Sequence, residues 1–160
     1  MARLNKYWLI LFLIFSIVGV FSSSIVLYTY YYLHIAPPLC SGIQSPFPGV
    51  TIDCIKVLSS SYAELFDLPL DFLALIWFII NIILVLMYYY GKYEKLSFKF
   101  LMYWRFIGLL IIPYLVYIEF VILKAICLYC TIMHLMIIAD FIVVTVYAYK
   151  NKLGILIPKI

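Results

Sequence analysis

The chain has 160 residues, of which 68% are hydrophobic and 11% are charged. About a quarter of the residues of a soluble domain are charged, so this composition excludes an ordinary water-soluble domain. The formal net charge of +4 does not indicate nucleic-acid binding, because most basic residues lie beside hydrophobic segments, as membrane orientation requires.

Four hydrophobic segments are each long enough to cross a bilayer, which takes about 20 mostly apolar residues. They predict spans at about 8–33, 70–90, 100–123 and 126–149, with an outer loop at 34–69. The first segment follows Arg3 and Lys6 as a signal peptide would, but its apolar run exceeds the 7–15 residues of a signal core. We expect an all-α membrane protein, a four-transmembrane-helix bundle in a single integral-membrane domain over residues 1–160.

The basic residues predict the orientation of this bundle in the cell membrane. Nine lie near the N-terminus, the second connection or the C-terminus, and only Lys56 and Lys124 lie near the other two connections. Basic residues prefer the cytoplasmic side, so both termini are expected there and the outer loop on the extracytoplasmic side. The nine residues are Arg3, Lys6, Lys92, Lys95, Lys99, Arg105, Lys150, Lys152 and Lys159.

All four cysteines fall on the predicted extracytoplasmic side, where disulfides form and persist. Cys40 and Cys54 lie in the outer loop, and Cys127 and Cys130 form a C-x-x-C at the outer end of the fourth span. Three interpretations are open: structural disulfides, a zinc site of four thiolates, and thiol–disulfide exchange. A C-x-x-C bridge closes too short a loop to stabilise a fold strongly, so exchange is favoured and no metal is expected.

The segment "AICLYCTIMH" suggests where electrons leave the cysteines. Cys127, Cys130 and His134 are three and four residues apart, so a helix places them on one stripe. A helix N-terminus stabilises a thiolate, and two cysteine pairs can then pass electrons by exchange. A lipid-soluble quinone is the natural acceptor in a membrane. His134 either hydrogen-bonds its carbonyl or is satisfied by a neighbouring backbone carbonyl, and Asp140 is expected to pack or to hydrogen-bond another helix.

Two segments resemble the vitamin K epoxide reductase family, in particular archaeal and bacterial members that oxidise thiols at the expense of quinone. They are "CIKVLSSSYAELFDLPLDFLA" from Cys54 and "YIEFVILKAICLYCTIMH" from Tyr117. The resemblance implies that Cys127 and Cys130 are the active-site pair, with Cys130 nearer the quinone. It also implies that Cys54 exchanges with Cys127 and that Cys40 meets the redox partner.

The same resemblance implies two further site residues. Ser60 lies six residues after Cys54, where the family has a serine important to the active site. His134 stands where the vertebrate enzymes use a tyrosine beside the quinone. Residues 59–66 are expected to form a short amphipathic helix over the site. The cofactor would be menaquinone, ubiquinone or a related quinone, and the partner a separate thioredoxin-like protein, because no such domain is fused to this chain.

Other functions remain open from the sequence. Cys40 and Cys54 enclose thirteen residues, more than is usual in the family, which weakens the role transferred to Cys40. The same four cysteines would also serve the reduction of a quinone epoxide. A non-catalytic membrane scaffold stabilised by disulfides is a third alternative. Bacterial membrane thiol oxidases of an unrelated family carry their cysteine pairs in two outer loops, whereas in this chain one pair lies at the start of a span.

Overall fold

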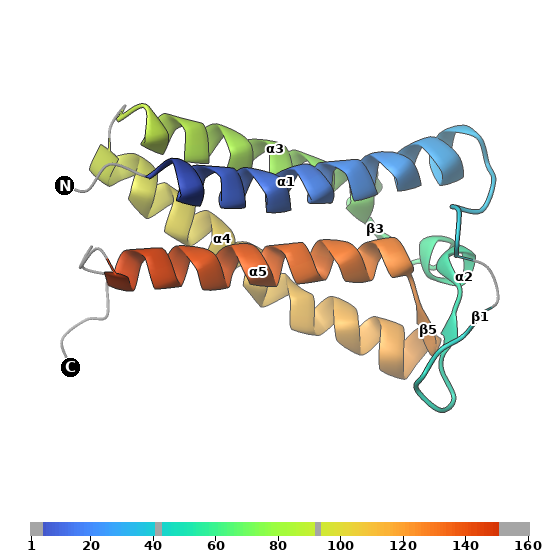
Figure 1. The fold of residues 1–160 in the computed structure, drawn as a ribbon. Coiled ribbons are helices and arrows are strands. Elements are labelled where there is room, and N and C mark those ends of the chain that lie inside the picture. The colour runs from blue at the N-terminus through green and yellow to red at the C-terminus, as the bar shows by residue number, and fades with distance from the viewer. Residues whose placement is uncertain (1–4, 41–42, 92–93, 151–160) are drawn as a thin grey trace.

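The computed structural model describes residues 5–40, 43–91 and 94–150. Figure 1 shows its long helices side by side, with the start of α1 and the end of α5 at one end and α2, β1 and β5 at the other. The long helices are α1 (Lys6–Val26), α3 (Leu70–Tyr89), α4 (Glu94–Tyr117) and α5 (Leu128–Lys150). Two of them continue into wider π-helical turns, α1 into η1 (Leu27–Tyr32) and α4 into η2 (Ile118–Leu123).

Among the residues that the structure describes, four helical segments are long and apolar enough to cross a membrane, which confirms the predicted all-α four-helix bundle. They are Lys6–Tyr32, Leu70–Tyr89, Leu96–Leu123 and Leu128–Lys150. Helix α1 contacts α3 and α5, and α4 contacts the same two helices, so the four close into a ring. The fourth span starts two residues later than predicted, because Ala125–Ile126 are extended in a short strand.

A buried polar network joins all four helices inside the ring. The guanidinium of Arg105 on α4 lies 3.5 Å from Asp140 on α5, and its Nε donates to Asn81 on α3 at 3.1 Å. The Asp140 carboxylate also accepts from Asn81 and from Ser16 on α1, and the ring of Phe12 lies 4.4 Å from the guanidinium carbon. Asp140 therefore makes the predicted helix-pair hydrogen bonds. Counting Arg105 among the cytoplasmic charges was wrong, because its side chain is fully buried and paired.

A small sheet ties the outer loop to the start of the last span. It contains β1 (Ile43–Gln44), β2 (Thr51–Ile52) and β5 (Ala125–Ile126), with β1–β2 antiparallel and β2–β5 parallel. The backbone N–H of Thr51 donates to Lys124 at 3.2 Å, and that of Asp53 donates to Ile126 at 3.1 Å. These bonds hold residues 51–53 against the chain that leads into Cys127.

The short helix of the outer loop lies earlier than predicted. Helix α2 spans Cys54–Leu58, and the side chain of Asp53 caps it by accepting from the Lys56 N–H at 3.0 Å. The predicted helix over 59–66 was wrong: turns follow α2, and then a hairpin of β3 (Glu64–Leu65) and β4 (Leu68–Pro69). Phe66 and Asp67 at its tip have φ of 55° and 61°, a left-handed conformation that a right-handed helix does not contain.

Candidate active site

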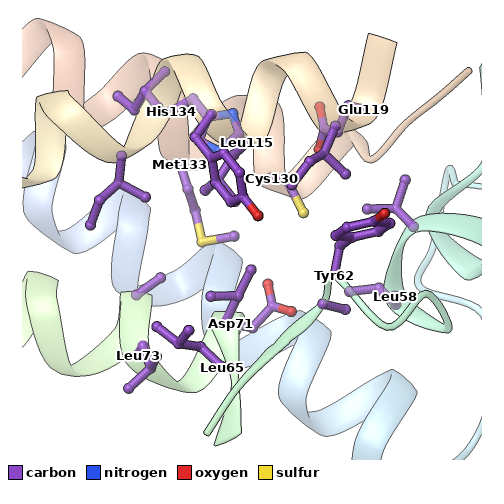
Figure 2. A pocket seen from close by; sticks show the side chains of 18 of the residues that line it. Leu58, Tyr62, Leu65, Asp71, Leu73, Leu115, Glu119, Cys130, Met133 and His134 are labelled. Carbon is purple, nitrogen blue, oxygen red and sulfur yellow. The ribbon is translucent and has the colours of Figure 1, made fainter. Parts of the chain in front are cut away.

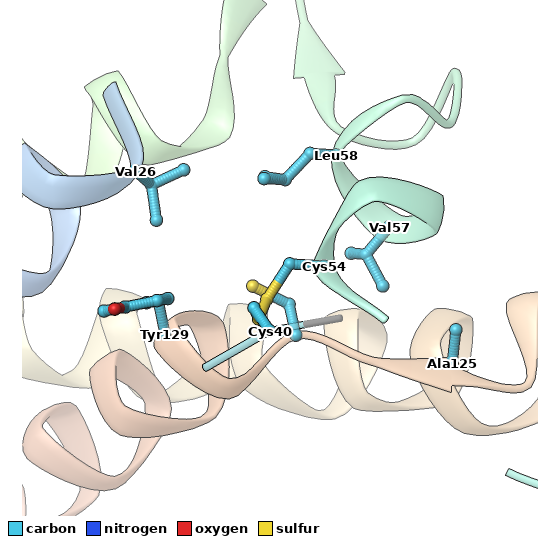
Figure 3. Close-up of a cluster of buried hydrophobic side chains, with 8 residues drawn as sticks. Val26, Cys40, Cys54, Val57, Leu58, Ala125 and Tyr129 are labelled. Carbon is cyan, nitrogen blue, oxygen red and sulfur yellow. A yellow bond between two sulfur atoms is a disulfide. The ribbon is translucent and has the colours of Figure 1, made fainter. Parts of the chain in front are cut away.

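The loop cysteines form a disulfide in the middle of a buried cluster. Cys40 and Cys54 have a Cα–Cα distance of 5.4 Å, and the Cys54 N–H donates to the Cys40 carbonyl at 3.2 Å. Figure 3 shows this bond between α2 and the start of α5, surrounded by apolar side chains. The Tyr129 hydroxyl on α5 donates to the Pro38 carbonyl at 3.0 Å, which holds the chain before Cys40 against α5.

Cys127 lies with the loop cysteines. The sulfur atoms of Cys40, Cys54 and Cys127 all lie within 4.8 Å of one another, and all three residues are buried. Cys130 is outside this group. The pairing of β2 with β5 explains the arrangement, because it places residue 54 and residue 127 just beyond paired strand ends.

Cys127 precedes the last helix instead of lying on its first turn. Its sulfur accepts from the Cys130 N–H at 3.4 Å, and its carbonyl accepts from the Thr131 N–H at 2.9 Å, so it caps α5. Lys124 has a left-handed φ of 50° and β5 is extended, so the helix cannot begin before this point. The prediction that the last helix already includes Cys127 was therefore wrong.

Cys130 faces a cavity of about 480 Å³, a size typical of small-molecule sites. Its walls come from α3, α4 with η2, and α5, and residues 57–65 of the outer loop cover it. Figure 2 shows the Cys130 sulfur pointing into this space. His134, one turn further along α5, lines the same cavity. The C-x-x-C is thus divided, with Cys127 beside the loop disulfide and Cys130 in the cavity.

The two predicted quinone-binding residues both reach this cavity. His134 is 9% exposed, and its imidazole makes no hydrogen bond to any residue that the structure describes. The sequence left open that a neighbouring carbonyl accepts a hydrogen bond from this histidine. No such carbonyl is present among residues 5–40, 43–91 and 94–150. The Ser60 hydroxyl donates to the Val57 carbonyl at 2.7 Å, just after α2. Its place in the cavity wall is shown, and its role in binding stays a prediction.

Two buried acids in the cavity wall were missed by the sequence analysis. Asp71 lies on the first turn of α3 and Glu119 on η2, and they are 3% and 5% exposed. Both interact electrostatically with Cys130. The signal was present, because an ionisable residue inside a predicted span is a candidate for function. Asp140, the one intramembrane acid considered from the sequence, belongs instead to the polar network in the bundle core.

Comparison with protein families gives one match to this chain. A search of curated proteins found no match. The model of the vitamin K epoxide reductase family matches residues 10–145, which include both cysteine pairs and the residues that line the cavity. That match covers far more than half of the 160 residues. The chain therefore belongs to the vitamin K epoxide reductase family, whose chemistry is thiol and quinone oxidation–reduction in a membrane.

Proposed function

We propose that the protein oxidises thiols of a partner protein outside the cytoplasm and passes the electrons to a membrane quinone. The observation that carries the proposal is the division of the C-x-x-C. Cys127 has its sulfur within 4.8 Å of both loop sulfurs, and Cys130 opens into the cavity. Electrons that reach the loop pair can therefore cross to the helix pair by sulfur exchange and continue to a ligand in the cavity.

The relay needs two exchange steps after the partner has reduced the Cys40–Cys54 disulfide. The Cys54 thiolate attacks the sulfur of Cys127 in a Cys127–Cys130 disulfide, and Cys130 leaves as a thiolate. Cys40 then attacks Cys54, so the loop disulfide forms again and Cys127 is released. The loop pair has lost two electrons, and Cys127 and Cys130 hold them as a dithiol.

The cavity fits the headgroup of a quinone. Its wall is mostly apolar and lies among membrane-spanning helices, with a few polar groups facing inward. A quinone bound there would be the acceptor of two electrons. His134 would donate a hydrogen bond to a carbonyl oxygen, and Ser60 lies in the loop segment that lines the cavity. The same properties suit menaquinone, ubiquinone and related molecules.

The proposed orientation rests on the basic residues outside the bundle core. Without Arg105, eight of the nine basic residues first counted remain on one side, against Lys56 and Lys124 on the other. This bias favours cytoplasmic termini and an extracytoplasmic site. The partner is a separate thioredoxin-like protein, since a loop disulfide near the membrane surface needs a soluble dithiol to reduce it.

Sealed vesicles containing the protein and a quinone test this function and the orientation together. A reduced thioredoxin-like protein added outside right-side-out vesicles should be oxidised while quinone absorbance falls. Inside-out vesicles should oxidise none of it. Cys130→Ser should lower quinone reduction to the uncatalysed rate, because no sulfur then connects the relay with the cavity. Quinone reduction by inside-out vesicles alone would contradict the orientation, and its absence from both kinds would contradict the function.

His134→Leu should weaken quinone binding while leaving sulfur exchange unchanged. The substitution removes a donor and keeps most of the side-chain volume. A neutral hydrogen bond contributes about 0.5–1.5 kcal/mol, so the apparent affinity for quinone should fall roughly two- to tenfold. Quinone titration of steady-state rates measures this effect. The matched control is Leu135→Ala, which changes an exposed neighbour on the same helix and should leave the titration unaltered. An unchanged affinity in His134→Leu would assign the imidazole to packing.

A further inference from the structure

Asp71 is an acid placed among apolar walls beside the reacting sulfur. Figure 2 shows its carboxylate and the Cys130 sulfur both pointing into the cavity. No other side chain that the structure describes hydrogen-bonds this carboxylate; its hydrogen bond is to its own backbone N–H. Taking a charge out of water without a partner is costly, so an acid used only for packing would normally be paired. Asp140, in the same bundle, is paired in this way.

Glu119 does not offer the same chemistry, although it lies in the same wall. Its carboxylate is engaged by the backbone N–H of Cys127, next to the cap of α5. That contact makes Glu119 a group that positions the C-x-x-C. The titratable groups that interact with Asp71 are Tyr31 from η1, Glu119 from η2 and Cys130 from α5, and Glu64 from β3 lines the same cavity.

We propose that Asp71 is a catalytic acid that carries a proton between the Cys127/Cys130 dithiol and a quinone oxygen, an inference that rests on the function proposed above. Formation of the Cys127–Cys130 disulfide breaks two S–H bonds and releases two electrons and two protons. Reduction of a quinone to a quinol takes up two electrons and forms two O–H bonds. Asp71 donates one proton to an oxygen as the electrons leave sulfur, and takes its replacement from a thiol of the pair. The second proton passes from the other thiol to the other oxygen.

The position of Asp71 makes this transfer chemically useful. The cavity wall is apolar, so water is a poor proton carrier there, and an oxygen that gains electrons without a proton would remain as a buried, unpaired anion. A general acid in reach of that oxygen typically accelerates a reaction by about 10²–10⁴-fold. Asp71 and Cys130 line the same cavity, whereas the exposed acid Asp67 lies on the β3–β4 turn and outside the cavity wall.

The test compares Asp71→Asn with the matched variant Asp67→Asn in the full-length protein. Asp71→Asn should reduce quinone about 100-fold more slowly than the unsubstituted protein, and Asp67→Asn should reduce it at the normal rate. Thiol alkylation followed by mass measurement gives a second readout. Without quinone, a reduced partner should convert Cys127 and Cys130 to thiols equally fast in all three proteins. During turnover, only Asp71→Asn should accumulate these two thiols.

Restoring a carboxyl group separates proton transfer from a structural role. Asp71→Glu should keep most of the rate, and added formate should accelerate Asp71→Ala and not Asp67→Ala. If Asp71→Asn does not fold, the formate response of Asp71→Ala carries the comparison. Normal quinone reduction by Asp71→Asn, or equal loss of both half-reactions without a formate effect, would overturn the role of Asp71. Failure of the unsubstituted protein to reduce quinone would instead overturn the proposed function.

Discussion

The Cys40→Ser protein is expected to accumulate a disulfide between Cys54 and Cys127 when a reduced partner and quinone are supplied. The substitution leaves the attack of Cys54 possible, because the two sulfurs lie in one buried group. It removes the thiol that would resolve the product, since Cys40 is the cysteine paired with Cys54. Non-reducing proteolysis with mass spectrometry should show the linked peptides as the dominant species, against a trace in the unsubstituted protein.

Cys54→Ser is the matched variant for this experiment. It leaves Cys40 as the single loop sulfur in the same buried group, and the proposed order predicts no stable link between Cys40 and Cys127. A second control is Cys40→Ser combined with Cys130→Ser, in which Cys127 has no disulfide to be attacked and no link should form. A Cys40–Cys127 link in Cys54→Ser, with none in Cys40→Ser, would exchange the roles of the two loop cysteines. Linkage of Cys54 to Cys130 would contradict the division of the C-x-x-C.

Asp140→Ala should be among the most destabilising single substitutions in the bundle. It leaves the Arg105 guanidinium fully buried without its anion, at a position enclosed by four helices. Removing one partner of a buried ion pair typically costs about 3–5 kcal/mol. Unfolding of the purified protein by titration with a denaturing detergent should show this loss. Ile142→Ala, at an exposed position on the same helix, should change the free energy of unfolding far less.

The double variant Arg105→Met, Asp140→Leu should recover much of that loss. No unpaired charge then remains in the core, and apolar replacements of buried ion pairs are often neutral or stabilising. Recovery should be incomplete, because the amide of Asn81 loses two partners. A double variant as unstable as Asp140→Ala would show that packing, and not the unpaired charge, determines the cost. This network is distinct from the redox site, so quinone reduction per folded molecule should persist in the double variant.

The spans could be predicted from sequence because one strong physical rule determines them. Backbone polar groups inside lipid must make their hydrogen bonds within the segment, so a long apolar run forms a helix. The boundaries followed weaker rules. The last helix starts after Cys127 because residues 125–126 pair with residues 51–52, a contact between distant parts of the chain that local pattern does not contain. The short helix was expected over 59–66 but precedes that segment. Asp53 supplies the cap at its start, and Ser59 ends α2.

The cysteines of the candidate site and their order were expected from the sequence and the family resemblance, whereas the two buried acids of the cavity wall were not. The sequence by itself determined the four spans, the cysteine pairs at one end of them, and the family resemblance that the match over residues 10–145 bears out. Only the tertiary structure brought Asp71 and Glu119 into one cavity and moved Arg105 from a predicted cytoplasmic charge into the bundle core. Hydropathy and spacing act along the chain, whereas pairing of buried charges, strand register and cavity walls depend on which distant segments meet.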